Sequence, residues 1–485
     1  MTQIELNGSS VAGEVIEGPL YEAAKKVYPR HVSGFFRQVK WAVLLVTLSI
    51  YYLLPFVRWD RGADQPSQAV LVDLGHRRFY FFWIEIWPQE VYYFTGLLIV
   101  AALTLFMMNA LAGRVWCGYL CPQTVWTDLY FAVERWVEGD RRQRMMRDAA
   151  PHGLAWWRLK ASKHAIWLII AWWTGGAWVL YFADAPHLVV SLFTFQAPFV
   201  AYGAIGVLTF TTYVFAGFMR EQVCLYMCPW PRIQAALTDE HALNVSYQWD
   251  RGEPRMSLKK AKAVAGQGGK AGDCVDCTYC VEVCPTGVDI RQGASLGCIQ
   301  CGLCIDACDT VMDKIGRPTR LIAYNTDVNI KRHQQGLPPV YKLIRPRTVL
   351  YSAVIALVGA VMIYTLTSRT ATSLAAIHDR NPLFVRTSDG SIRNGYDLRI
   401  ANKASRTRRF WLEATGLEVK VEVVGASVSK VPSFEVGPDQ TREVRVLVTA
   451  PQAPEQASTP ITFDIIGSDD KVAAEAKDFF RSGAN

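Results

Sequence analysis

Eight cysteines between residues 274 and 308 form two runs with the same spacing. The first run is Cys274-x-x-Cys277-x-x-Cys280-x-x-x-Cys284, and Pro285 follows it. The second run repeats the first, cysteine for cysteine, as Cys298, Cys301, Cys304 and Cys308. This spacing is typical of a pair of 4Fe–4S clusters in which the fourth cysteine of each run binds the other cluster. One cluster is therefore expected on Cys274, Cys277, Cys280 and Cys308, and the other on Cys284, Cys298, Cys301 and Cys304.

Structural zinc is the alternative for these eight thiols. Zinc sites usually take two C-x-x-C pairs for each ion, not three close cysteines and a distant fourth. Asp309 stands where the first run has Pro285, but a proline at this position shapes the turn and is not a ligand. Because each 4Fe–4S cluster carries one electron at a time, the two runs predict an electron relay of the bacterial ferredoxin type.

Four more cysteines form two pairs of the pattern C-x-x-x-C-P. The pairs are Cys117 with Cys121 and Cys224 with Cys228. An i, i+4 spacing predicts both thiols of a pair on one helix face, and the proline predicts that the second cysteine ends the helix. If the pairs meet, four thiolates form a soft site for Cu(I), zinc or an iron–sulfur cluster. The alternative is two unrelated pairs of buried cysteines that pack as small apolar residues.

Methionines lie near both pairs, and a thioether is a further Cu(I) ligand. Methionine also fills ordinary cores, so a ligand role is left open. The twelve cysteines all lie in tight groups between Cys117 and Cys308, a distribution that indicates metal ligation rather than a disulfide scaffold. The methionines concerned are Met107, Met108, Met219 and Met227.

Long apolar runs position these cysteines, since 51% of the 485 residues are hydrophobic. Five runs approach the roughly 20 residues that a helix needs to cross a bilayer. They lie at about 40–57, 91–112, 164–183, 198–219 and 348–367. The aromatic segment 79–87 is too short to cross, and we expect it at the headgroup level.

Basic residues flank the apolar runs, so the net charge of +8 does not indicate a nucleic-acid partner. Lys26, Arg30, Arg37 and Lys40 precede the first run, and the segments 135–163 and 220–347 are also basic. The loop 185–198 contains no Lys or Arg. By the positive-inside rule, the N-terminus and the cysteine-rich segments are predicted to be cytoplasmic and the C-terminus external.

Residues 385–480 alternate apolar and polar side chains over short stretches such as 419–424 and 443–448. This period predicts an antiparallel β-sandwich of about 90–100 residues. The region contains no Cys or His, which favours a structural or interaction domain. The predicted order is a cytoplasmic segment 1–39, a membrane domain 40–223, a cytoplasmic region 224–347 with an α+β ferredoxin domain at about 265–320, a helix 348–367 and an external domain 368–485.

This combination resembles the bacterial cytochrome c oxidase accessory family of the FixG/RdxA/CcoG type. The resemblance covers nearly the whole chain: five spans, the pairs Cys117/Cys121 and Cys224/Cys228, the ferredoxin run from Cys274 to Cys308, and the C-terminal β domain. It implies a multi-domain protein of the bacterial inner membrane. Its five-helix bundle would carry an inserted two-cluster ferredoxin domain and a periplasmic immunoglobulin-like sandwich.

The resemblance further implies a role in assembling the cbb-type haem–copper oxidase. The implied reaction is the reduction of Cu(II) to Cu(I), with the copper-delivery machinery of that oxidase as partner. Cys117, Cys121, Cys224 and Cys228 are then the candidate catalytic residues and copper ligands. The electrons would come from a cytoplasmic donor that the sequence does not identify.

Two other functions are compatible with these residues. One is a quinol-linked protein that passes electrons across the bilayer, with the aromatic segment 79–87 near a quinone headgroup. The other is a non-enzymatic copper-binding scaffold for oxidase assembly, in which the clusters sense redox state or stabilise the fold.

Overall fold

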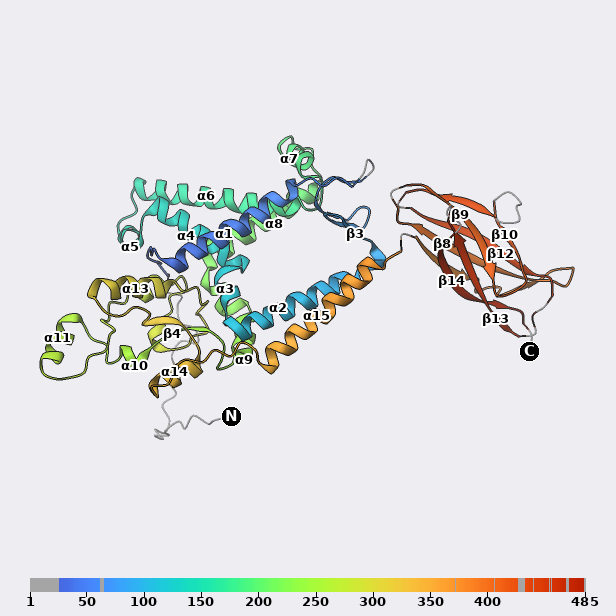
Figure 1. Cartoon of the computed structure of the whole chain (residues 1–485). Helices are drawn as coiled ribbons and strands as arrows, with labels where there is room; N and C mark the ends of the chain where they lie inside the picture. Colours follow the sequence, from blue (N-terminus) through green and yellow to red (C-terminus); the bar gives the residue numbers. More distant parts are fainter. Residues whose placement is uncertain are drawn as a thin grey trace, which may run out of the picture. The chain divides into compact units, whose positions relative to one another are not determined.

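The chain forms two compact units in a computed structural model (Figure 1). The model describes residues 26–61, 65–370, 372–404, 406–425, 432–438, 440–452, 454, 456–467 and 471–483. Most of the predicted cytoplasmic segment 1–39, up to residue 25, lies outside the described residues. The first unit comprises Met1–Tyr52, Leu105–Val179 and Pro198–Val349, and the second comprises Leu53–Thr104, Leu180–Ala197 and Leu350–Asn485.

Four helical segments among the described residues are long and apolar enough to cross a membrane. They confirm the predictions at 40–57, 91–112, 198–219 and 348–367. Their bounds are Phe35–Phe56 (α1 Phe35–Leu53 with η1 Leu54–Phe56), Tyr92–Ala112 (α2), Phe199–Met219 (α8 Phe199–Thr212 with the π-helix η3 Tyr213–Met219) and Pro346–Thr367 (α15).

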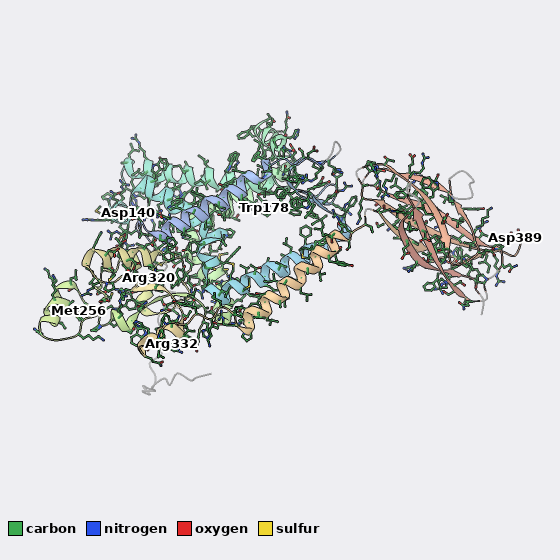
Figure 2. All side chains as sticks on the ribbon, viewed as in Figure 1. Asp140, Trp178, Met256, Arg320, Arg332 and Asp389 are labelled. Atoms are coloured by element: carbon green, nitrogen blue, oxygen red, sulfur yellow. The ribbon has the colours of Figure 1, made fainter. Side chains whose placement is uncertain are left out.

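The fifth predicted span, 164–183, is not among these four. Its residues belong to the helix α6, which runs from Leu154 to Val179 and therefore begins and ends earlier than predicted. The first turns of α6 carry Arg158, Lys160 and Lys163. Tryptophans on the same helix are partly exposed, including Trp178, which is labelled in Figure 2 and is 50% exposed. Charge and tryptophan together make α6 less apolar than the other four helices.

The helix α6 packs against both α4 (Pro122–Glu138) and α8. Trp167 of α6 stacks on Tyr130 of α4 with ring centroids 5.0 Å apart. The Tyr130 hydroxyl donates to the Trp167 carbonyl at 2.9 Å, and the Trp167 indole donates to the Tyr130 carbonyl at 3.2 Å. A Cβ on Gly175 would lie 2.9 Å from the Ile205 carbonyl oxygen, so this glycine allows α6 and α8 to approach closely.

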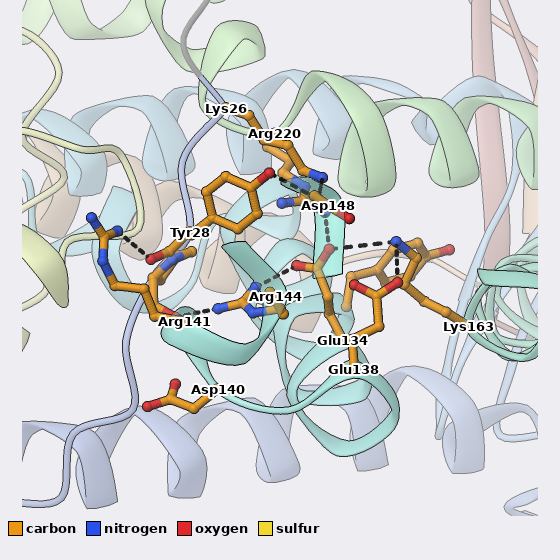
Figure 3. A network of polar contacts seen from close by, with 12 residues as sticks. Lys26, Tyr28, Glu134, Glu138, Asp140, Arg141, Arg144, Asp148, Lys163 and Arg220 are labelled. Carbon is orange, nitrogen blue, oxygen red and sulfur yellow. Dashed lines mark hydrogen bonds and ion pairs between the residues drawn. The ribbon is translucent and has the colours of Figure 1, made fainter. Parts of the chain in front are cut away.

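A buried ion network joins α4, α5 (Arg141–Ala149), α6 and the residue that follows η3 (Figure 3). Glu134 accepts from Arg144 at 2.8 Å and from Arg220 at 3.1 Å, and Lys163 lies 3.5 Å away. Burial pushes the pKa of Glu134 upward, but the charges of Arg220, Arg144 and Lys163 outweigh burial and leave the pKa lowered. The carboxylate is therefore ionised at neutral pH and neutralises cations that have no access to water.

Short elements surround the cysteine runs in the first unit. Strand β4 pairs antiparallel with β5, from Asn244 opposite Asn325 to Tyr247 opposite Ile322. The two strands flank both cysteine runs in the sequence, and the sheet that they form packs on α13. The remaining elements are α3 Val115–Tyr119, η4 Val223–Met227, α9 Trp230–Leu237, β4 Asn244–Tyr247, α10 Trp249–Gly252, α11 Leu258–Gly266, α12 Tyr279–Glu282, η5 Ile290–Gln292, α13 Leu303–Ile315, β5 Ile322–Asn325 and α14 Asp327–Gln334.

The predicted C-terminal β-sandwich is confirmed in the second unit. One antiparallel sheet has the order β10-β12-β8-β6, with β7 also paired to β8, and the other has the order β11-β9-β13-β14. Alternate side chains of the two sheets, among them Tyr396, Phe410, Phe463 and Phe480, are fully buried between them. The strands are β6 Thr372–His378, β7 Val385–Arg386, β8 Ile392–Asn402, β9 Arg408–Thr415, β10 Lys420–Val423, β11 Ser433–Val436, β12 Gln440–Ala450, β13 Ser458–Ile466 and β14 Val472–Arg481.

The aromatic segment 79–87 forms part of a small sheet in the second unit. Strands β1 (Val70–Asp73), β2 (Arg78–Phe81) and β3 (Ile84–Ile86) pair in that order. A short turn, η2 (Pro88–Glu90), then leads into α2, and the helix α7 (Ala185–Phe193) belongs to the same unit.

The buried ion network predicts a large stability difference between two Glu→Gln variants. Glu134→Gln leaves Arg144 and Arg220 buried without a charge partner, while Lys163 keeps Glu138 at 3.0 Å, and should cost about 3–5 kcal/mol of unfolding free energy. Glu240→Gln breaks the exposed pair with Lys331 (3.5 Å) and should cost less than about 1 kcal/mol. Thermal unfolding in detergent measures both, and equal losses would contradict the assigned role of Glu134.

The same experiment has a pH arm. Because the pKa of Glu134 is lowered on folding, its contribution is present above its ordinary value of 4.5 and is lost as the pH falls below that value. The wild type should therefore lose this contribution on acidification, whereas Glu134→Gln should not.

Candidate metal centres

The eight cysteines of the two runs gather in two groups. Cys284, Cys298, Cys301 and Cys304 line one small cavity of about 20 Å³, together with Cys280 from the other run. These four are the set predicted for one cluster. The thiols whose charges act on Cys308 are those of Cys280, Cys274 and Cys277. With Cys308, they are the set predicted for the other cluster. In each set, one cysteine comes from the other run, as the two-cluster spacing predicts.

The two runs also repeat in backbone conformation. Between the first and third cysteines, Asp276 and Thr278 have φ near +55°, at 55° and 56°. The equivalent residues of the second run, Gln300 and Gly302, have φ of 54° and 75°. Left-handed residues at equivalent positions give the two loops the same sharp turns between their cysteines.

Burial raises the pKa of five of these eight thiols. The pKa of Cys280, Cys298 and Cys308 rises to about 12, first because of burial and then because neighbouring cysteines repel a second negative charge. Cys304 is raised still further for the same reasons. A thiolate at these positions therefore needs a nearby cation, and a metal centre supplies one.

The two C-x-x-x-C-P pairs converge on one cavity in the first unit. Cys117, Cys121, Cys224 and Cys228 all line this cavity of about 170 Å³. Burial, followed by the charges of the other three thiols, raises the pKa of Cys117 to about 12, and burial likewise raises that of Cys224 to about 12. Residues more than a hundred positions apart in the sequence thus form one sulfur-rich site. Of the four methionines considered from the sequence, none lines this cavity.

The local structure of the pairs differs from the prediction of a single helix face. Cys117 lies in the short helix α3, while Cys121 is the N-cap of α4, where Pro122 takes the first helical position. Cys224 lies in the π-helix η4, which ends at Cys228. A break or a widened turn between the two cysteines replaces the regular i, i+4 arrangement. The prediction that the second cysteine ends the helix is correct for Cys228, the C-cap of η4, but not for Cys121, because α3 ends before it and Cys121 caps the start of α4.

A cysteine of the second run also lines the four-cysteine cavity. Cys298 is the only one of the eight run cysteines among its lining residues. The cavity predicted to hold one cluster and the four-cysteine cavity therefore share Cys298 and Ile299 in their walls. Among the described residues, no three Cys, His, Asp or Glu side chains are arranged as ligands of a single ion, so the cysteines are grouped by the cavity that they line.

Two polar residues of this site were not predicted from the sequence. Arg114 lines the four-cysteine cavity, and only 8% of its surface is exposed. The indole nitrogen of Trp230 is buried without a hydrogen-bond partner on the same cavity. Only their closeness to the cysteine pairs in the sequence could have indicated a role at this site, since Arg114 stands three residues before Cys117 and Trp230 two residues after Cys228.

Three family models match parts of the chain. A 4Fe-4S binding domain matches residues 94–141, which contain the first cysteine pair. A 4Fe-4S dicluster domain matches residues 219–327, which contain the second pair and both runs. The IG-like fold at the C-terminal of FixG matches residues 362–483.

Whole-length relatives are also similar to this chain. The nitrogen fixation protein FixG of Rhizobium meliloti is 47% identical over 476 residues, covering 92% of this chain and 90% of the relative. Protein RdxA of Cereibacter sphaeroides is 49% identical over 450 residues, covering 92% and 93%. A crystal structure of a FixG-related protein from Vibrio parahaemolyticus aligns with 24% of this chain and 99% of its own, at 21% identity and a TM-score of 0.21.

Proposed function

The chain belongs to the FixG/RdxA family of membrane polyferredoxins, and on this basis we propose that it is a cupric reductase. It is an iron–sulfur electron-transfer protein with apolar helices suited to a membrane. The proposed reaction reduces Cu(II) to Cu(I) for the maturation of a cbb-type cytochrome c oxidase. The proposed partners are that oxidase, its copper-delivery machinery and a cytoplasmic electron donor.

The clusters would be held by the cysteines grouped above: Cys274, Cys277, Cys280 and Cys308 for one, and Cys284, Cys298, Cys301 and Cys304 for the other. The donor set fits, because each group offers four thiols and burial disfavours their ionisation without a metal. When bound, such clusters supply one-electron transfer. The protein's own contribution is to exclude water and fix the ligands.

The single observation that carries the proposal is the cavity that contains both cysteine pairs and Cys298. Copper is the substrate, and one electron converts Cu(II) to Cu(I) without breaking a bond. Four thiols favour the soft Cu(I) product, so the site stabilises the reduced side of the reaction. Gln234 accepts from the Cys117 thiol at 3.4 Å, and Thr124 donates to the Cys117 carbonyl at 2.6 Å. These contacts hold the thiol in the wall of the cavity.

The proposed topology has five crossings, with α6 as the additional one. At 26 residues and about 1.5 Å per residue, α6 is long enough to cross a bilayer. Its basic residues lie in the first turns, where long side chains reach the cytoplasmic headgroups. An odd number of crossings puts the two ends on opposite sides, and the basic segments at the N-terminus and in 220–347 then assign the N-terminus and the ferredoxin region to the cytoplasm and the sandwich to the periplasm.

Reporter fusions test this topology. Alkaline phosphatase, which is active only outside the cytoplasm, should be active when fused after residue 485 and inactive when fused after residue 340. A fusion within the loop 185–198 should also be active. Four crossings without α6 would instead leave the two ends on the same side, and an inactive C-terminal fusion would exclude the five-crossing arrangement.

Copper reduction by cysteine variants tests the proposed activity. In anaerobically purified full-length protein, Cys117→Ala and Cys224→Ala should lose most Cu(II) reduction while retaining the iron of the two clusters. The reason is that each substitution removes one of the four cavity thiols. Met227→Leu is the matched control, because Met227 lies between Cys224 and Cys228 but outside the cavity wall. Reduction at the wild-type rate in either cysteine variant would rule out this copper site.

A third iron–sulfur cluster is the second candidate for the four-cysteine cavity. It is favoured by the match of a 4Fe-4S binding domain to the segment with Cys117 and Cys121. The electron-transfer function is retained, and copper would then be reduced elsewhere on the chain or not at all.

Iron analysis separates the two candidates. A third cluster predicts about twelve iron atoms per chain, whereas two clusters predict about eight. In the first case Cys117→Ser should lower the iron content by about a third, and in the second it should leave iron unchanged. Iron quantitation with acid-labile sulfide and EPR decides between them.

A further inference from the structure

Arg114 is a buried cation without a carboxylate partner. Within the described part of the chain, no ion pair involves its guanidinium, although only 8% of the residue is exposed. The comparable buried arginines have acidic partners: Arg37 pairs with Asp128 at 2.9 Å and Arg144 with Glu134 at 2.8 Å. A buried charge without a counter-charge is costly, so the location of the missing negative charge is informative.

The nearest ionisable groups to Arg114 are thiols. Its charge interacts with Cys117 of the first pair and with Cys298 of the second run. Both thiols line the same cavity as Arg114, and the unpartnered indole N–H of Trp230 lies on that cavity as well. One cation and one free donor therefore belong to residues that line a cavity with five cysteines and, among the described residues, no carboxylate in its wall.

The hydrogen bonds of Arg114 join the three segments that supply the cavity's cysteines. The residue itself precedes Cys117 by one helical turn. Its Nη1 donates to the carbonyls of Leu296 at 2.6 Å and Cys298 at 3.3 Å. Its Nη2 donates to the Pro231 carbonyl at 2.8 Å, just beyond Cys228. Its backbone N–H donates to Oε1 of Gln300 at 2.7 Å, so the contact with the cluster loop is made twice.

We infer that Arg114 is the positioning residue that links the four-cysteine cavity to the cluster loop at Cys298, and that its charge balances thiolate-ligated metal on both sides. The inference rests on the proposed function, since it takes both cavities to hold such metal. A fixed positive charge favours the more negative, reduced form of a nearby centre and raises its reduction potential. Because Arg114 contacts the loop that carries Cys298, the cluster that uses Cys298, rather than the one that uses Cys274, is the one next to the proposed copper site and the one whose potential Arg114 raises.

An EPR-monitored redox titration of full-length protein in detergent tests this. Arg114→Gln keeps a hydrogen-bond donor but removes the charge, whereas Arg114→Lys keeps the charge. In Arg114→Gln, the cluster that uses Cys298 should become at least tenfold harder to reduce, which corresponds to about 59 mV for one electron. Arg114→Lys should stay near the wild-type potential. The Cys274→Ser protein identifies which signal belongs to which cluster.

Arg345→Gln is the matched control. Arg345 is also buried and donates to the Ala110 carbonyl at 2.6 Å, but Asp239 is its charge partner. Its loss should leave both potentials unchanged. A wild-type potential in Arg114→Gln with intact iron would overturn the inference, while copper reduction by the wild type would leave the proposed function in place.

Loss of iron is also decisive. If Arg114→Gln loses iron and Arg114→Lys retains it, the charge is required to hold the centre, as inferred. If both variants lose iron, the hydrogen bonds of the guanidinium are required to hold the centre and its charge is not. That result overturns the electrostatic role. A wild-type protein without iron would refute the proposed function itself, a result independent of either variant.

Discussion

The ionisation of buried sulfur is the constraint on which this structure depends. Thiols become metal ligands only as thiolates, yet burial raises the pKa of Cys117, Cys224, Cys280 and Cys308 to about 12. The fold therefore packs several thiols around shared cavities, where a metal centre can supply the positive charge that burial makes necessary. Left-handed residues in the cysteine loops and the broken helices at the pairs serve this packing.

Charge is balanced in two ways within the first unit. On α4 and α6, Glu134 is surrounded by Arg144, Arg220 and Lys163, so protein groups alone neutralise one another. At the four-cysteine cavity, the guanidinium of Arg114 donates to backbone carbonyls, and the ionisable groups that act on its charge are the thiols of Cys117 and Cys298. The first network joins helices through protein charges alone, whereas the second leaves a place for the charge of the metal that the thiols are proposed to bind.

The helices place the cysteine pairs through their ends. Both pairs follow an apolar helix, α2 or α8 with η3, and both are carried by short or irregular segments, α3 and η4. π-Helical turns are rare and frequent at functional sites, because the extra residue per turn redirects side chains. Here the widened turn lies within the second C-x-x-x-C motif itself. The irregular hydrogen bonding of η4 therefore sets the positions of Cys224 and Cys228.

Local spacing in the sequence was sufficient for four apolar helices and for the alternating strands of the sandwich, and it also predicts the ligand grouping in the two cysteine runs. Each depends on residues close together in the chain, whose periodicity determines which side chains share a face or loop. The meeting of Cys117 and Cys121 with Cys224 and Cys228 depends instead on how α4, α6 and α8 pack, through contacts such as Tyr130 on Trp167. Only the tertiary structure placed Arg114 in the wall of the four-cysteine cavity and in contact with the cluster loop, because the partners of its guanidinium are backbone carbonyls, which leave no pattern in a sequence.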